Sequence, residues 1–350
     1  MRKLVTLETV VEVRPIPDAD AIEAIMIRGW VVVAKRGEFQ VGDRCVYFEI
    51  DSALPLSDER FAFLGARGTN TTLTGSKVHV LKTARLRGVY SQGLALPTAI
   101  FPELANTLEH DTEIHESDSS DSEEGTDFAA LLGVEKWEPP LPANMGGDAI
   151  GAFPTSLARK TDAERIQNLT EVFAKLRTYT WVATEKIDGT SVTYINDQGT
   201  LRVCGRNWEL AEGSNIYWEM ADSLKLRERM ESGWVIQGEI YGEGVQANPL
   251  KVRGRHLAVF GMFNGRAPVP LAEWPSWIQE LAAPTLDFDL ASFESADQLV
   301  AAVDGLKSTR SPERLAEGIV LHTANGEELP ELDLRGCFKV ISNKYLLKHQ

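Results

Sequence analysis

Residues 181–190, WVATEKIDGT, are the stretch on which the fold and the chemistry of this chain depend. The apolar first half predicts a β-strand, and Gly189 predicts the end of that strand. Because side chains two positions apart on a strand point to the same face, we expect Lys186 and Asp188 to face one pocket. A buried lysine that has lost its proton is a nitrogen nucleophile. The alternative is an exposed lysine–aspartate pair at a strand end, and the remaining sequence decides between the two.

Five further stretches downstream carry side chains that suit a nucleotide. An arginine and a glutamate can bind ribose hydroxyls, a lysine can bind a phosphate, an aromatic ring can stack on a purine, and a carboxylate suits Mg²⁺ or Mn²⁺. Taken alone, each is also explained by a strand core or a solvated surface. The five are Arg206 in VCGRN, Glu239 in IQGEIYGEG, Phe260 in LAVFGMF, Glu317 in EGIVL and Lys339 in CFKVI.

In this order the six stretches resemble the covalent nucleotidyltransferases, which are the polynucleotide ligases and the capping guanylyltransferases. EKIDGT is most similar to RNA ligases that seal nicks in double-stranded RNA, because the acid directly precedes the lysine, whereas DNA ligases usually place it two residues before. The N-terminal part resembles the barrel of the Deinococcus-type ATP-dependent RNA ligases. The stretches that carry this second resemblance are residues 17–23, 29–30, 35–39, 42–43, 47–52 and 87–94, together with 160–162 and 165–168 further along the chain.

The resemblance implies a lysyl-AMP intermediate and a role for each motif residue. Lysine attacks the ATP α-phosphorus, AMP moves to a 5′-phosphate end, and a 3′-OH displaces the AMP. Nearby cations, meaning the metal and Lys339, are expected to lower the pKa of the attacking lysine. The implied catalytic residues are Lys186, Lys339 and Asp188, the implied nucleotide-binding residues are Glu185, Lys186, Arg206, Glu239, Phe260 and Lys339, and the implied ligand of Mg²⁺ or Mn²⁺ is Glu317.

One departure from the family pattern concerns the last motif. Related RNA ligases often carry two lysines there, as K-x-K, whereas this chain has Cys337 in the first place and Lys339 in the second. Lys344 is one candidate for the second cation, and the other possibility is that it has no counterpart.

The first 112 residues predict an all-β domain. About five short, alternating strands separated by glycine and proline turns suit an OB-fold barrel that binds nucleic acid, with a small sandwich as the alternative. Basic residues interleaved with an aromatic can hold a phosphate backbone, although a solvated strand face has the same composition. Those residues are Lys77, Lys82, Arg85 and Arg87, near Tyr90.

Residues 113–150 read as a linker, acidic and serine-rich at first and then rich in proline and glycine. Residues 151–350 predict an α+β adenylyltransferase domain with a largely antiparallel sheet. Helical periodicity predicts helices over 161–176 and about 215–230. Neither G-x-G-x-x-G nor a Walker-type loop is present, which disfavours dinucleotide and P-loop chemistry.

The composition limits the kind of surface, the cellular compartment and the membrane association that we expect for this chain. The net charge of −15 argues against a generally phosphate-binding surface but allows a local basic groove. Three distant cysteines with no zinc-type spacing favour a reducing compartment, and no apolar run is long enough to cross a bilayer. We therefore expect a cytoplasmic monomer with no membrane association and no obligate protein partner.

These observations predict an ATP-dependent RNA ligase that seals 3′-OH/5′-phosphate nicks in RNA-containing duplexes, for RNA repair. Two alternatives stay open at this point. The first is a DNA ligase or a GTP-dependent capping-type nucleotidyltransferase, which would use the same chemistry on another substrate. The second is a non-catalytic nucleic-acid-binding protein.

Overall fold

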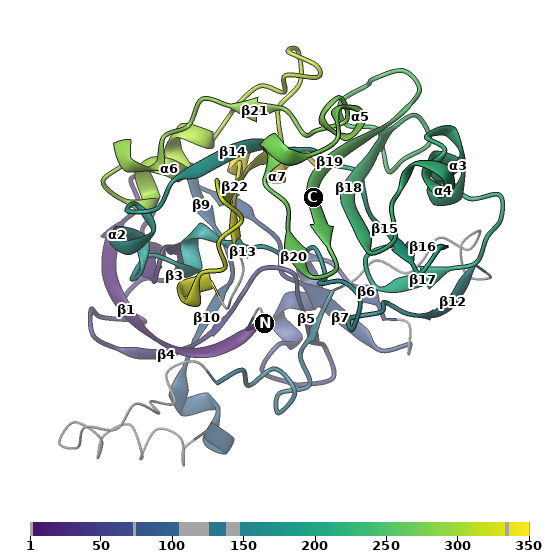
Figure 1. Ribbon diagram of the computed structural model, residues 1–350. Helices are drawn as coiled ribbons and strands as arrows, with labels where there is room; N and C mark the ends of the chain where they lie inside the picture. The colour runs from purple at the N-terminus through teal and green to yellow at the C-terminus, as the bar shows by residue number, and fades with distance from the viewer. Residues whose placement is uncertain (1–2, 73–74, 105–125, 138–147, 333–335, 350) are drawn as a thin grey trace, which may run out of the picture. The chain divides into compact units, whose positions relative to one another are not determined.

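The computed structural model describes residues 3–72, 75–104, 126–137, 148–332 and 336–349 (Figure 1). The chain divides into two compact units, one formed by Met1–Pro140 with Gln350 and the other by Leu141–His349.

The first unit is built from antiparallel strands. Its five-stranded sheet has the order β10-β4-β1-β2-β3, and a four-stranded sheet has the order β11-β5-β7-β6. The long strand β1 pairs with β4 through its first half and with β2 through its second half. Two hydrophobic clusters pack against the sheet, one with Val46 and Phe48 of β4 and the other with Cys45 and Tyr47. The strands are β1 (Val5–Pro15), β2 (Ile22–Ile27), β3 (Trp30–Lys35), β4 (Arg44–Phe48), β5 (Ser52–Pro55), β6 (Asn70–Thr71), β7 (Lys77–Val80), β10 (Leu94–Pro97) and β11 (Glu135–Lys136), with 3₁₀ turns η1 (Ala62–Arg67), η2 (Thr98–Ile100) and η3 (Pro102–Leu104). A separate hairpin consists of β8 (Ala84–Leu86) and β9 (Val89–Ser91).

The structure corrects the predicted linker over residues 126–137. Phe128, Leu132 and Val134 are buried in the core of the first unit, where they pack with strand residues such as Val5. Asp127 Oδ1 accepts hydrogen bonds from the backbone N–H groups of residues 4 and 5, and β11 pairs with β5. The linker prediction was wrong for these residues because it was based on the acidic, serine-rich sequence that precedes them. It gave too little weight to the few apolar residues that follow. Residues 113–125 and 138–147 of the predicted linker lie outside the described residues.

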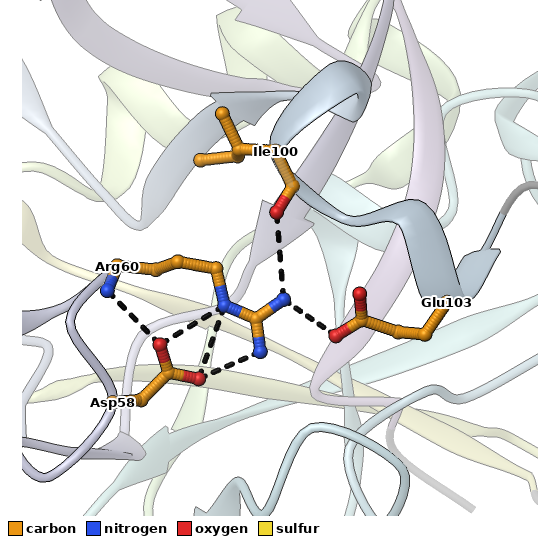
Figure 2. A network of polar contacts seen from close by, with 4 residues as sticks. All are labelled: Asp58, Arg60, Ile100 and Glu103. Carbon is orange, nitrogen blue, oxygen red and sulfur yellow. Dashed lines mark hydrogen bonds and ion pairs between the residues drawn. The ribbon is translucent and has the colours of Figure 1, made fainter.

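Arg60 joins two loops of the first unit (Figure 2). Its guanidinium donates to both carboxylate oxygens of Asp58, with Nη2 2.6 Å from Oδ2, and Nη1 lies 2.5 Å from Oε1 of Glu103. The guanidinium carbon lies 4.6 Å from the centroid of the Phe101 ring. The hydrogen bond from Arg60 holds the pKa of Asp58 below its usual range. This cluster fastens the segment that contains η2 and η3.

Replacing Arg60 with methionine is expected to lower the free energy of unfolding of the first unit by about 1–2 kcal/mol at pH 7. Methionine keeps apolar contact with Phe101 but removes the charged donor. Because the Asp58 pKa is depressed in the folded chain, its contribution is complete above pH 4 and is lost as the pH falls through the folded value. Urea unfolding at pH 7 and pH 3 checks this, since the difference between variant and wild type should shrink in acid. An equal difference at both pH values would contradict it.

The second unit contains two sheets. The seven-stranded sheet has the order β12-β17-β16-β15-β18-β19-β20, and the five-stranded sheet has the order β13-β23-β22-β14-β21. All of their pairings are antiparallel except that of β13 with β23, which confirms the expected α+β class. The strands are β12 (Ala149–Ala152), β13 (Glu164–Arg165), β14 (Trp181–Lys186), β15 (Thr190–Asp197), β16 (Thr200–Cys204), β17 (Trp208–Leu210), β18 (Trp234–Gly242), β19 (Arg255–Asn264), β20 (Ala267–Pro268), β21 (Thr285–Leu286), β22 (Gly318–Thr323) and β23 (Cys337–Ile341).

Short helices cover these sheets. In Figure 1, α3 and α4 lie together beside β15 and β16. Their apolar side chains, such as Trp218 and Leu226, are buried against the seven-stranded sheet. The helices are α2 (Phe173–Leu176), α3 (Ile216–Ser223), α4 (Leu226–Arg229), α5 (Ser276–Gln279), α6 (Ala296–Val303) and α7 (Asn343–His349), with 3₁₀ turns η5 (Ile166–Asn168), η6 (Leu271–Glu273), η7 (Leu290–Ser292) and η8 (Pro330–Leu332).

The helix predicted over 161–176 is mostly wrong. Only Phe173–Leu176 is α-helical, because residues 164–165 instead form β13, which pairs with β23. The apolar residues Ile166 and Phe173 are nevertheless buried, as the pattern required. The helix predicted near 215–230 is confirmed as α3 and α4, with a break at Lys225, whose φ is 53°.

Candidate active site

The five-stranded sheet brings two lysines onto one face. Lys186, the last residue of β14, lies opposite Gly318 on β22, and Lys339 on β23 lies opposite Val320. Residues directly opposite on antiparallel strands share a face, and so do residues two apart on one strand. Lys186 and Lys339 therefore point to the same side of the sheet, although 153 positions separate them in the sequence (339 − 186 = 153).

A cavity of about 420 Å³ lies between this face and the seven-stranded sheet. Carbon-rich and charged groups both line it, as nucleotide pockets require. Of the eight predicted site residues, six line the cavity: Glu185, Lys186, Arg206, Glu239, Phe260 and Lys339. The other two predicted site residues are Glu317 and Asp188. Glu317 accepts a hydrogen bond from Lys186, and Asp188 follows Lys186 by two positions in the sequence.

Two motif glycines are required because the backbone passes very close to a neighbouring strand. A Cβ atom at Gly189 would lie 2.1 Å from the carbonyl oxygen of Ile240, where the turn after β14 crosses β18. A Cβ atom at Gly318 would lie 2.1 Å from the carbonyl oxygen of Val340 on β23. Any side chain at either position would push apart the strands that hold Lys186 and Glu317.

Lys186 is paired with a carboxylate. Its Nζ donates to Glu317 Oε2 at 2.6 Å. Burial disfavours the ammonium, but the negative charges of Glu317, Glu239 and Asp188 outweigh burial and raise the pKa of Lys186 above its ordinary value. Among the protein's own charged side chains, the carboxylates thus act on Lys186 more strongly than the cations do. The expected lowering of this pKa depended on a bound metal as well as on Lys339, and it stays a prediction. The carboxylates near the lysine outnumber it, and that balance was not visible from the spacing of the motifs.

The neighbouring carboxyls also have perturbed pKa values. Burial raises the pKa of Glu239 to about 8, against the opposing attraction of Lys186, and burial likewise raises the pKa of Glu317. The site therefore gains stability by taking up protons or cations. Within the described residues, no three His, Cys, Asp or Glu side chains form a group that could hold a metal by themselves. One carboxylate, Glu317, fits a Mg²⁺ or Mn²⁺ ion that takes its remaining ligands from phosphates and water.

Arg206 and Phe260 occupy the opposite wall. Arg206 follows β16, its side chain is 48% exposed, and its Nη2 lies 2.5 Å from Asp162 Oδ1. Arg206 and Glu239 both line the cavity. Phe260 lies on β19, half-buried, with its ring available at the cavity.

Glu185 has a structural partner. It is 2% exposed, and its Oε2 accepts hydrogen bonds from the backbone N–H of Thr309 at 2.8 Å and from the Thr309 hydroxyl at 2.5 Å. Its side chain thus holds the loop around residue 309. A contact between Glu185 and a nucleotide remains a prediction.

The last motif, CFKVI, has Cys337 where related RNA ligases often have a first lysine. Cys337 lines the cavity beside Lys339, whereas Lys344 does not belong to the described lining. The Nζ of Lys344 instead lies 3.7 Å from Asp304. The other two cysteines, Cys45 and Cys204, are buried, and burial raises the pKa of each thiol to about 12, so they serve packing.

Tyr345 is a site residue that the motifs did not reveal. It lies on α7, is 3% exposed, and its hydroxyl donates a hydrogen bond to Asp188 Oδ2. Ser342, the residue before α7, also contacts the EGIVL motif, because its backbone N–H donates to the Glu317 carbonyl at 2.9 Å. The C-terminal helix therefore orients the aspartate that follows the lysine.

Replacing Tyr345 with phenylalanine is expected to slow covalent labelling by nucleotide about tenfold, because Asp188 loses its buried donor. A double-mutant cycle with Asp188→Asn checks this, since two residues that act through one hydrogen bond should give non-additive losses. Tyr179→Phe is the matched control, because that hydroxyl bonds Glu331 instead. Fully additive losses would show that Tyr345 does not act through Asp188.

Comparison with known proteins agrees with this geometry. A family profile for OB-fold domains matches residues 4–98, and a profile for RNA ligase matches residues 179–341. A solved structure of Naegleria gruberi RNA ligase with PPi is 36% identical, with a TM-score of 0.83, and the match covers 100% of this chain and 99% of that one. The chain belongs to the RNA ligase family.

Two further structures of the Naegleria gruberi RNA ligase are similar to this RNA ligase. A glutamate-to-alanine variant with AMP and Mn is 36% identical with a TM-score of 0.83, and a lysine-to-alanine variant with ATP and Mn is 35% identical with a TM-score of 0.81. Each match covers 99% of both chains. No curated protein matches in a direct comparison. Of the residues that the structure describes, none belongs to a helix long and apolar enough to span a membrane.

Proposed function

We propose that this RNA ligase uses ATP and a divalent metal to seal 3′-OH/5′-phosphate nicks in RNA-containing duplexes, through AMP held on Lys186. The observation that carries the proposal is the position of Lys186 at the end of β14, with its Nζ 2.6 Å from Glu317 Oε2. Lys186 lines the same cavity as Lys339, Phe260 and Arg206. Similar RNA ligases that hold ATP or AMP with Mn support the choice of cofactors. The N-terminal barrel and the EKIDGT motif favour the Deinococcus-type group.

In the first step the neutral amine of Lys186 attacks the α-phosphorus of ATP. The N–P bond forms, the bond to the β-phosphate oxygen breaks, and pyrophosphate leaves, while the amine gives up its proton. Lys339 would hold the α-phosphate, Arg206 and Glu239 the ribose hydroxyls, and Phe260 would stack on the adenine. Asp188, held by Tyr345, would orient the lysine.

A divalent metal, when bound, neutralises charge on the phosphate oxygens as pyrophosphate departs. Glu317 is the residue that would hold it. A metal held by Glu317 would also offset the negative charge that raises the pKa of Lys186, and the amine would then lose its proton more readily. In the later steps AMP passes to the 5′-phosphate, and the 3′-OH then displaces it and closes the phosphodiester bond.

Sealing of four nicked duplexes tests the proposal. The strand that ends in the 3′-OH and the strand that begins with the 5′-phosphate are each made of RNA or DNA, and α-³²P-ATP or α-³²P-GTP is the donor. We expect labelling of the protein by ATP alone and sealing wherever the 3′-OH strand is RNA. Labelling by GTP, or sealing of an all-DNA nick at the same rate, would overturn the proposal.

A further inference from the structure

The basic residues of the first unit are concentrated in one part of the sequence. Between Arg60 and Pro102 there are six lysines and arginines and neither aspartate nor glutamate, although the whole chain carries a net charge of −15. Arg60 is occupied by Asp58 and Glu103. The other five are Arg67, Lys77, Lys82, Arg85 and Arg87.

The β8–β9 hairpin carries two of these basic residues, Arg85 and Arg87. Arg85 and Tyr90 are directly opposite on its two strands, and the guanidinium carbon of Arg85 lies 5.6 Å from the Tyr90 ring centroid. Arg87 lies in the turn between the strands with a φ of 47°. Both arginines are exposed, as is Lys82 just before β8. Neither Lys82, Arg85 nor Arg87 forms an ion pair with any carboxylate in the described part of the chain.

The base of the hairpin is fixed from both strands by one buried side chain. Gln92, just after β9, donates through Nε2 to the hydroxyl of Thr83, just before β8, at 3.1 Å. The backbone carbonyl of Gln92 accepts a hydrogen bond from the Tyr47 hydroxyl at 3.1 Å, and its backbone N–H donates to the Val31 carbonyl at 2.8 Å. The strands leaving this anchor hold the arginines in position before any partner arrives, which reduces the entropy lost on binding.

Strand β7, which precedes the hairpin in the sequence and belongs to another sheet, carries further exposed polar side chains. Lys77 and His79 are two apart on β7 and therefore share its outer face, while Val78 and Val80 point into the core. Nδ1 of His79 lies 2.8 Å from the carbonyl oxygen of Gly68, which brings the residue after Arg67 to this strand.

We propose that the β8–β9 hairpin, with Lys82 at its base, is the surface on which the first unit holds the phosphate backbone of the nucleic-acid duplex. The inference rests on the proposed function and names the substrate contact. Exposed cations without carboxylate partners suit phosphates, and the ring of Tyr90 beside Arg85 suits a sugar or base. The contact is expected to be independent of base sequence, because backbone phosphates carry no sequence information.

The test uses the full-length protein with Arg85→Gln and Arg87→Asn. Asparagine tolerates the left-handed backbone at position 87, so the turn is preserved. The matched control is Lys3→Gln with Arg14→Gln, which removes the same charge elsewhere in the first unit. The probe is a fluorescein-labelled nicked duplex with an RNA 3′-OH strand, and its anisotropy is measured from 50 to 300 mM salt without ATP.

We expect the hairpin variant to bind about tenfold more weakly, and its slope of log affinity against log salt to be smaller by about two, one for each lost phosphate contact. Self-adenylation should stay within about twofold of wild type, since the hairpin is not in the nucleotide cavity. Affinity and slope equal to those of wild type, in a wild type that seals nicks, would overturn this inference alone. A wild type that neither labels with ATP nor seals would instead refute the proposed function.

Discussion

Lys186→Ala is expected to abolish covalent labelling by α-³²P-ATP, to below about one thousandth of the wild-type rate, because alanine offers no nucleophile for the α-phosphorus. Sealing of a nick with an ordinary 5′-phosphate should be lost with it. The variant removes one partner of a partly buried ion pair, so its fold is checked first by thermal unfolding.

The control for this variant is Lys175→Ala, which removes an exposed lysine from α2. Its labelling should match that of wild type. A second readout uses a nick whose 5′ end already carries AMP. Lys186→Ala should retain part of its activity on that substrate, because the first step is bypassed. A labelled adduct on Lys186→Ala would refute the assignment of the nucleophile.

Glu317→Gln is expected to have two opposite effects. Labelling by ATP should fall at least about 10²-fold, because the carboxylate that would hold the metal is gone. The amine of Lys186 should become easier to deprotonate, because Glu317 is the leading charge that raises its pKa. With that charge removed, burial favours the neutral amine.

Competitive acetylation of the protein without ATP or metal separates the two effects. Mass spectrometry reports the reactivity of Lys186 and of Lys175 from pH 7 to pH 11. In wild type the midpoint for Lys186 should lie above the ordinary value of a lysine side chain, and in Glu317→Gln it should move to lower pH. Glu313→Gln, an exposed glutamate in the same loop, is the control and should change neither midpoint nor labelling. An unchanged midpoint in Glu317→Gln would contradict the proposed coupling.

Several features of the site were predictable because they are local. The apolar run before Lys186 forms β14, and the glycines at 189 and 318 are required where backbones nearly touch. The order of the motifs also predicted that Lys186, Glu239, Phe260 and Lys339 would meet, and all four line one cavity. The α+β class and the OB fold followed from strand periodicity in the same way.

Other features depended on contacts that no local pattern records. Residues 161–176 have helical periodicity, but pairing of β13 with β23 overrides it. Residues 126–137 join the first core through Phe128 and Val134 even though the neighbouring sequence is strongly acidic. In both cases burial against distant strands stabilises a conformation that local propensity does not favour.

By itself, the sequence predicted Lys186 as the nucleophile and determined the motifs around it and the α+β class, because these depend on residue type and short spacing. Only the tertiary structure decided the electrostatics of Lys186 and the support of Asp188. The lysine pKa is raised because three carboxylates from separate strands and turns surround one amine in a buried place. Tyr345 reaches Asp188 across 157 positions of the chain. The charges around Lys186 and the hydrogen bond to Asp188 come from residues that only the folded chain brings together. The motif therefore pointed to Lys186, but it did not predict the direction of its pKa shift.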